Sequence, residues 1–237
     1  GRLIIIDGPI AGGKTTVKAM IKELLGGKAW VITQSPFALM TYLLTKAMTK
    51  LISNEQCKGI YPITCLETSK PRLLSKLLNV LIMLDLTQSM IIAAASKILN
   101  IMGINVVIED YVPTIILDHT LYKKLYTNDE NTNTLIMKIY DTNLAVLRAL
   151  KPVGIYVKAN SEVRIRRSIA RGYRVARPET LHDSVRNGIL IRVMNETIGK
   201  VYIIDNNGSL EDTRRQVIDI LAKLNNETST CLLYTSD

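Results

Sequence analysis

The sequence has little cysteine, few aromatic residues and no uninterrupted apolar stretch of membrane-spanning length. Its 237 residues include three cysteines, Cys57, Cys65 and Cys231. Their number is odd and their spacing is not that of metal ligands, so we expect three free thiols in a reducing compartment. The longest apolar stretch, 80–99, is interrupted by polar and charged residues such as Asp85. This interruption predicts a buried helix and not a membrane span.

Aromatic residues make up only 5% of the chain, although its net charge is +9. A basic balance has two interpretations: nucleic-acid binding, or a pocket for polyanionic nucleotides beneath a solvated basic surface. Nucleic-acid surfaces usually interleave basic groups with aromatic residues that stack on bases. Because aromatic residues are scarce and the arginines cluster within 164–177, we favour the nucleotide pocket. We expect no nucleic-acid partner and no membrane association.

Length and composition predict one α/β domain. Hydrophobic residues at 47% suffice for a sizeable core, and charged residues at 22% are ordinary for a globular protein. No internal repeat or long linker divides the chain. We therefore predict a single domain over 1–224 and a flexible tail over 225–237. The first residues already have a strand pattern, so we expect no signal peptide.

Short apolar, β-branched stretches alternate with longer segments of helical spacing. This alternation predicts a parallel five-stranded sheet with helices on both faces. The predicted strands are 3–7, 29–33, 105–108, 154–158 and 201–204. The predicted helices are 14–25, 35–51, 71–100 as one or two helices, 132–150, 161–171, 180–198 and 210–224, with 53–70 irregular.

The strongest chemical signal is a glycine-rich segment between the first strand and the first helix, called here the phosphate loop. Its glycines let backbone N–H groups converge on phosphate oxygens, and the following helix adds its partial positive charge. Lys14 would bridge the β- and γ-phosphates, and the Thr15 hydroxyl would ligate Mg²⁺. A chance match is the alternative, but the strand before it and the helix after it are the context that the motif requires. We predict a site for ATP and Mg²⁺. The segment matches the P-loop pattern G-x-x-x-x-G-K-[ST] in Gly8, Pro9, Ile10, Ala11, Gly12, Gly13, Lys14 and Thr15, with Thr16 following.

Two carboxylates follow the third predicted strand. Glu109 and Asp110 would lie at the carboxyl edge of the sheet, beside the phosphate loop. A solvated strand end is the alternative, but the phosphate loop favours a catalytic role for both. We assign Glu109, together with Thr15, to the metal.

Six arginines lie within 164–177, and the spacing of Arg164, Arg167 and Arg171 places these three on one face of a predicted helix. A solvated basic face is the alternative. Phosphoryl transfer needs cations over the transferring group, and a mobile basic segment supplies them while it excludes water. We therefore predict an arginine-rich lid in which Arg171 and Arg177 act on the phosphates.

In their order along the chain, these motifs resemble those of the deoxynucleoside kinases, and most closely the herpesvirus-type thymidine kinases. The resemblance spans about residues 2–200 and implies the P-loop kinase fold. It also implies an acceptor site in which Gln88 reads the thymine edge and Met90 packs on the base. Tyr61 would lie near the deoxyribose and Glu179 near the 3′-hydroxyl. The resemblance rests on residues 7–16, Met40-Thr41-Tyr42, Ile60-Tyr61, Thr87-Gln88-Ser89-Met90, Glu109-Asp110 and 164–179.

The chain departs from this family in two places. The family has a Glu after the second strand as general base, whereas 33–36 here reads TQSP, with Gln34 and no carboxylate. The family's acid-Arg pair is here Glu109-Asp110. Two residues also have a purely structural alternative. Gln88 would then hydrogen-bond a neighbouring backbone group instead of the base. Ser209 would cap the last helix, in a turn that otherwise resembles the turn near the adenine in P-loop kinases.

The resemblance implies ATP-dependent phosphorylation of a pyrimidine deoxynucleoside, with thymidine as the first choice. A monophosphate acceptor needs no general base, so a thymidylate kinase is one alternative. A kinase-like nucleotide-binding protein with weakened catalysis is another, because the base and the arginine are missing. We expect an intracellular location, cytoplasmic or nuclear, in the host cell for a viral protein. The sequence leaves open whether the chain forms a homodimer.

Overall fold

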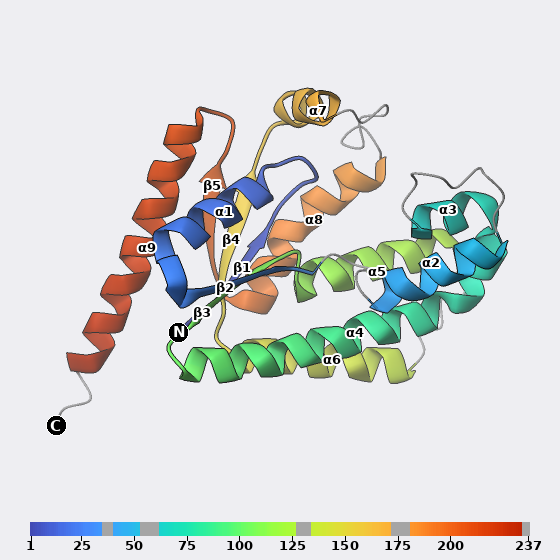
Figure 1. The fold of residues 1–237 in the computed structure, drawn as a ribbon, viewed down its shortest axis with the longest axis horizontal. Helices are drawn as coiled ribbons and strands as arrows, with labels where there is room; N and C mark the ends of the chain where they lie inside the picture. Colours follow the sequence, from blue (N-terminus) through green and yellow to red (C-terminus); the bar gives the residue numbers. More distant parts are fainter. Residues whose placement is uncertain (35–39, 53–61, 127–133, 172–180, 234–237) are drawn as a thin grey trace.

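The computed structural model describes residues 1–34, 40–52, 62–126, 134–171 and 181–233 (Figure 1). At its centre lies a parallel five-stranded sheet in the order β2-β3-β1-β4-β5. The sheet and its helices on both faces confirm the predicted fold class, and each strand agrees with its predicted bounds to within one residue. The strands are β1 Leu3–Asp7, β2 Ala29–Thr33, β3 Asn105–Glu109, β4 Val153–Lys158 and β5 Lys200–Asp205.

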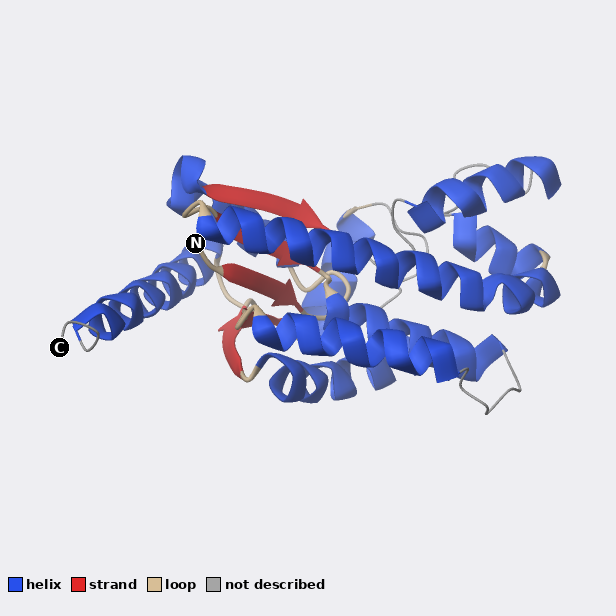
Figure 2. Ribbon diagram, turned by 90° about the horizontal axis from the view of Figure 1, so that it is seen from below, coloured by secondary structure: helices blue, strands red, loops and turns tan. Residues whose placement is uncertain are grey.

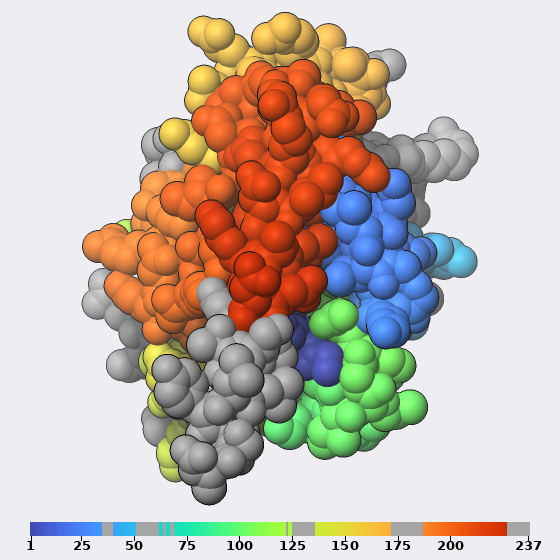
Figure 3. Space-filling view, turned by 90° about the vertical axis from the view of Figure 1, so that its left-hand side faces the viewer, coloured from blue at the N-terminus to red at the C-terminus, as the bar shows by residue number. Residues whose placement is uncertain are grey.

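Two layers of helices cover the sheet. Alternate residues of β1 face opposite layers, as the two-residue period of a strand requires. Ile4 and Ile6 pack with α1 and α9, whereas Leu3 and Ile5 pack with α5, α6 and α8. Figure 3 shows α9 lying between α8 and α1, with α7 above them. The helices are α1 Lys14–Leu25, α2 Met40–Ile52, α3 Pro62–Ser69, α4 Pro71–Ile101, α5 Val112–Tyr126, α6 Thr134–Ala149, α7 Ser161–Ala170, α8 Leu181–Ile198 and α9 Leu210–Leu233, with the 3-10 turn η1 Gly26–Lys28.

Three helical segments differ from the sequence-based expectation. Helix α5 was not predicted, because its apolar residues serve two different core clusters and so form no single stripe: Val112 packs in one and Ile115 in the other. Helix α3 lies in the stretch expected to be irregular. Helix α9 continues past the predicted end at Leu224, which packs in the core, because the polar residues that follow Leu224 carry no apolar spacing that would predict a helix.

Helices α2 to α6, called here the helical half, extend past the sheet, with α4 running along and beyond the strands (Figure 2). The amino-terminal part of α4 is buried through Leu74, Leu78 and Leu81 against α3, α5 and α6. By length and composition alone α4 could cross a membrane, a weak indication that core helices also give. Its burial agrees with the predicted core helix.

Cys65 on α3 is disulfide-bonded, so the expectation of three free thiols is wrong. A chain with three cysteines can still form one disulfide bond.

A buried polar cluster ties the helical half together. Thr41 of α2 donates to Asp85 Oδ1 of α4, and His119 Nε2 of α5 lies 3.0 Å from Asp85 Oδ2. Asp85 is 2% exposed and His119 is 0% exposed. The Tyr140 ring of α6 lies 6.3 Å from the His119 ring, and burial, aided by the Asp85 charge, raises the pKa of Tyr140. The cluster fixes α2 and α5 against α4, one turn before Gln88.

Candidate active site

The phosphate loop joins the carboxyl end of β1 to α1. Helix α1 begins at Lys14, with Gly13 as N-cap and no side-chain cap, so its first N–H groups are available to an anion. Gly13 has φ 100° and Ala11 has φ 58°, both in the left-handed region. A Cβ at Gly8 would lie 2.4 Å from the Val157 carbonyl oxygen of β4. Glycine at this position therefore lets the loop pass close to the neighbouring strand.

Lys14 lies over its own loop. Its Nζ donates to the carbonyl oxygens of Gly8 at 3.0 Å and Pro9 at 3.3 Å, and it lies 3.4 Å from Asp110 Oδ1. Asp110 has φ 58°, a left-handed conformation in which Asp is one of the few enriched non-glycine residues. Loop carbonyls and the Asp110 carboxylate thus hold the ammonium at the loop, where phosphate oxygens would replace them.

The structure brings together Thr15 and Glu109, the two predicted metal ligands. Thr15 Oγ1 donates to Glu109 Oε1 at 2.9 Å. The other carboxylate oxygen, Oε2, lies 2.5 Å from Lys18 Nζ and accepts from Thr33 Oγ1 at 3.3 Å. Lys18 was not selected from the sequence. Its position one turn after Thr15 on α1 is the signal that could have identified it, because residues three apart share a helix face.

This donor set fits Mg²⁺. Magnesium usually keeps several waters and takes one or two carboxylates together with substrate phosphate oxygens. Thr15 and Glu109 offer a hydroxyl and a carboxylate beside the phosphate loop. Within the described ranges, no group of three or more His, Cys, Asp and Glu side chains could hold a metal alone. Nucleotide phosphates would therefore complete the coordination, and the metal would compete with Lys18 for Glu109.

A second set of contacts holds the phosphate loop from the side of β5 and α7. Asn206, which follows β5, donates from Nδ2 to the Gly12 carbonyl oxygen at 2.7 Å. Arg167 of α7 donates to the same oxygen at 3.3 Å and to the Asn206 carbonyl oxygen at 3.0 Å. Burial, and then the nearby charges of Arg171 and Arg166, lower the pKa of Arg167. The sequence placed Arg167 in the predicted lid but did not predict its contact with Gly12 or the contact of Asn206 there, because both contacts depend on how α7 and β5 dock.

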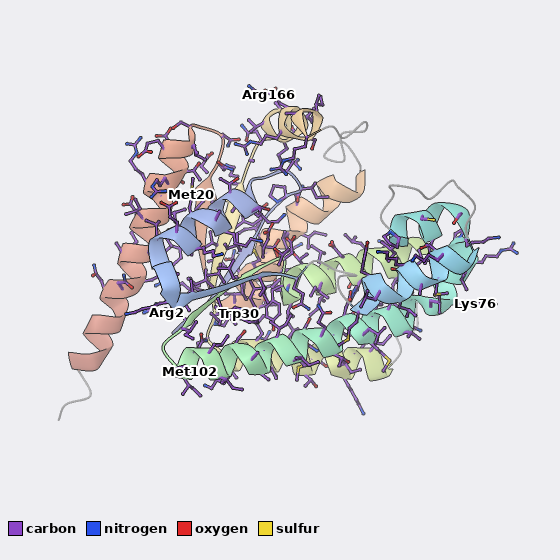
Figure 4. All side chains as sticks on the ribbon, viewed as in Figure 1. Arg2, Met20, Trp30, Lys76, Met102 and Arg166 are labelled. Carbon is purple, nitrogen blue, oxygen red and sulfur yellow. The ribbon has the colours of Figure 1, made fainter. Side chains whose placement is uncertain are left out.

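The predicted lid arginines take different positions along α7. Arg164 is buried, and Arg171 is exposed as the C-cap residue. Figure 4 shows Arg166 on the outer side of α7. Arg177 and Glu179 lie outside the described residues, as does Tyr61, so their assigned roles stay predictions.

The predicted acceptor side of the site lies at the ends of β2 and β3 and along α4. Gln34 is 1% exposed and donates from its backbone N–H to the Glu109 carbonyl oxygen and from Nε2 to Ser89 Oγ, both at 2.8 Å. Gln88 is 7% exposed, and its Oε1 accepts from the Met40 N–H at 3.4 Å. Gln88 therefore makes the hydrogen bond to a backbone group that was the structural alternative to base recognition. Met90 is half-buried on the same helix, and the base-reading roles stay predictions.

The turn after β5 ends in a capping box. Ser209 Oγ accepts from the Asp212 N–H at 3.1 Å, and the Asp212 carboxylate accepts from the Ser209 N–H at 3.2 Å. This reciprocal pair starts α9 and confirms the predicted cap.

Comparison with protein-family models and with curated proteins gives no match. Solved structures do match. A thymidylate kinase from Candida albicans superimposes with a TM-score of 0.60 at 14% identity, covering 95% of this chain and 93% of that one. A deoxyadenosine kinase from M. mycoides with bound dATP gives 0.58 at 16% identity, covering 94% and 98%. The same enzyme with bound dCTP gives 0.54 at 17% identity, covering 94% and 99%.

The chain has the fold of P-loop nucleoside and nucleotide kinases. The match extends over nearly the whole of both chains, which confirms the fold implied by the resemblance. At these identities the similarity is one of fold. The herpesvirus-type part of the resemblance finds no support in these three structures.

Proposed function

We propose that this chain is an ATP-dependent phosphotransferase that acts on a pyrimidine deoxynucleoside, thymidine first. The observation that carries the proposal is the 2.9 Å pairing of Thr15 with Glu109 beside Lys14 and the start of α1. Phosphoryl transfer relies on positioning and on charge stabilisation, and these groups are the ones it uses for the β- and γ-phosphates and their metal. Structures of the same fold that are named deoxyadenosine kinase and thymidylate kinase support a nucleoside or nucleotide as acceptor, and the choice of a pyrimidine rests on Gln88 and Met90.

In this proposal the chain's residues hold ATP by charge and by backbone N–H groups. Lys14 exchanges the Gly8 and Pro9 carbonyls for phosphate oxygens, and the N-terminus of α1 faces the same anion. A bound Mg²⁺ on Thr15 and Glu109 would neutralise charge on the β- and γ-phosphates. Arg171 and Arg177 would reach the γ-phosphoryl group as it leaves ADP for the acceptor oxygen.

The acceptor proton needs a base, and Gln34 cannot supply one. Gln34 Oε1 is buried and has no hydrogen-bond partner in the described part of the chain. This amide oxygen can accept a hydrogen bond, but an amide does not take up a proton at neutral pH. Glu109 and Asp110 are the carboxylates at this edge of the sheet and would take the proton of a 5′-hydroxyl. Gln88 offers a donor and an acceptor to a pyrimidine edge, and Met90 an apolar surface to its face.

A thymidylate kinase is the second candidate, and Lys18 favours it. Its ammonium lies between Glu109 and Thr33, at the ends of β3 and β2 on the acceptor side. A cation there suits an acceptor that already carries a phosphate, and an ionised phosphate oxygen needs no base. A nucleotide-binding protein with weakened catalysis is the third candidate, because Gln34 and Asp110 replace a base and an arginine.

Competition between acceptors distinguishes the three candidates. The chain is incubated with labelled ATP, Mg²⁺ and equal concentrations of thymidine and thymidine monophosphate. We expect thymidine to be phosphorylated and Lys14→Ala to abolish the transfer. Exclusive use of the monophosphate would replace the first candidate with the second. Binding of ATP with transfer to neither acceptor would favour the third.

A further inference from the structure

Asn206 is held on every side by specific contacts. It is 4% exposed, and its backbone N–H donates to the Lys158 carbonyl oxygen at 2.8 Å. Its Nδ2 donates to the Gly12 carbonyl oxygen at 2.7 Å, and its Oδ1 accepts from Thr213 Oγ1 at 2.8 Å. A carbonyl can only accept, so the amide nitrogen must face Gly12. Thr213, which is fully buried at the start of α9, completes the arrangement by donating to the amide oxygen.

The Gly12 carbonyl matters because it shares a peptide unit with the Gly13 N–H. In a planar trans peptide the C=O and the N–H point in opposite directions. Asn206 and Arg167 both draw the carbonyl toward β5 and α7. The Gly13 N–H is thereby directed to the opposite side, where the loop N–H groups would converge on a bound anion.

The packing around Gly13 shows how closely Asn206 and the loop fit together. Gly13 has φ 100°, and a Cβ built there would lie only 2.0 Å from Asn206 Nδ2. The absence of a side chain at Gly13 is therefore what lets Asn206 reach the loop backbone.

We infer that Asn206 is a positioning residue for nucleotide binding, acting through the Gly12–Gly13 peptide with Thr213 as its support. The inference rests on the proposed function, since it requires the phosphate loop to bind phosphates. Asn206 makes no contact with the nucleotide in this scheme. Its effect must therefore appear with any ligand that fills the phosphate loop, with or without a base.

Calorimetry with two ligands tests this role. MgATP and inorganic triphosphate are titrated into the wild type, Asn206→Ala and Thr213→Val, and apo stability is measured for each by urea unfolding. The matched control is Thr197→Val on α8, where a buried hydroxyl donates to its own helix at Val193. We expect Asn206→Ala to weaken both ligands by about tenfold, the equivalent of one lost hydrogen bond. Thr213→Val should weaken both in the same direction, and Thr197→Val neither.

Each outcome supports or overturns the inference. Wild-type affinity of Asn206→Ala for both ligands would overturn it and leave the proposed function standing. Weakened ATP with unchanged triphosphate would also overturn it, because Asn206 would then act on the base or ribose. If Asn206→Ala does not fold, Thr213→Val decides by the same comparison. If the wild type binds neither ligand, the proposed function fails and the inference fails with it.

Discussion

Replacing Asp85 by Asn tests the buried polar cluster of the helical half. Asn keeps an oxygen that accepts from Thr41 Oγ1. It carries no negative charge, however, and its amide nitrogen takes the place of the carboxylate oxygen beside His119 Nε2. Leaving one buried polar group unsatisfied costs about 1–3 kcal/mol. In a chain of this size, each kcal/mol lowers the melting temperature by about 2–4 °C, so we expect a decrease of about 2–12 °C.

The measurements are thermal unfolding and urea unfolding of the wild type, Asp85→Asn and Asp219→Asn. Asp219 is exposed on α9, so its replacement should change stability by no more than about 0.5 kcal/mol. A lower midpoint with an unchanged slope would report lost stability of the same folded structure. The cluster joins α2, α4 and α5, whereas the phosphate loop joins β1 and α1, so ATP affinity should stay near the wild-type value. If Asp85→Asn is no less stable than Asp219→Asn, the cluster does not hold the helical half together.

Three further predictions concern single side chains. Lys18→Met should lower the Mg²⁺ concentration at half-saturation of ATP binding, because the Lys18 ammonium occupies one side of Glu109; Lys22→Met is the exposed control, and an unchanged midpoint would contradict the competition. Burial raises the pKa of Tyr111, so its contribution to stability is complete below the unfolded pKa of about 10 and decreases as pH rises above it. Tyr111→Phe should therefore reduce the loss of stability between about pH 8 and pH 10.5, and an equal loss in both proteins would exclude that role. Arg171→Ala should lower turnover more than ATP affinity, because a lid cation acts mainly on the transition state; unchanged turnover would make Arg171 a solvated surface charge.

The sheet and the phosphate loop could be predicted because their signals are local. The central strands β1, β3 and β4 are buried and therefore appear as short continuous apolar runs, and the loop has a fixed pattern between a strand and a helix. The pairing of Thr15 with Glu109 also followed from the sequence, although 94 residues separate them. Parallel strands end at one edge, so residues that follow β1 and β3 must meet there.

The contacts missed from the sequence depend on docking and on side-chain reach. The spacing of the arginines on α7 indicated a shared face, but only the packed structure shows that Arg167 reaches Gly12 while Arg171 lies in solvent. The amide of Asn206 reaches the loop because β5 and α9 pack beside it. Helix α5 was missed for a related reason, since a helix buried between two clusters has no single apolar stripe.

Calorimetric titration of ATP with Mg²⁺ into the wild type and Lys14→Ala tests nucleotide binding most directly. Lys14 supplies the ammonium that would contact the β- and γ-phosphates, and its removal should weaken ATP binding strongly. Urea unfolding of both proteins shows whether Lys14→Ala is folded. We expect saturable binding to the wild type and a much lower affinity in a folded Lys14→Ala. A wild type that binds no ATP, or a Lys14→Ala variant that binds it equally well, would contradict the assignment of residues 8–15 as a nucleotide phosphate site.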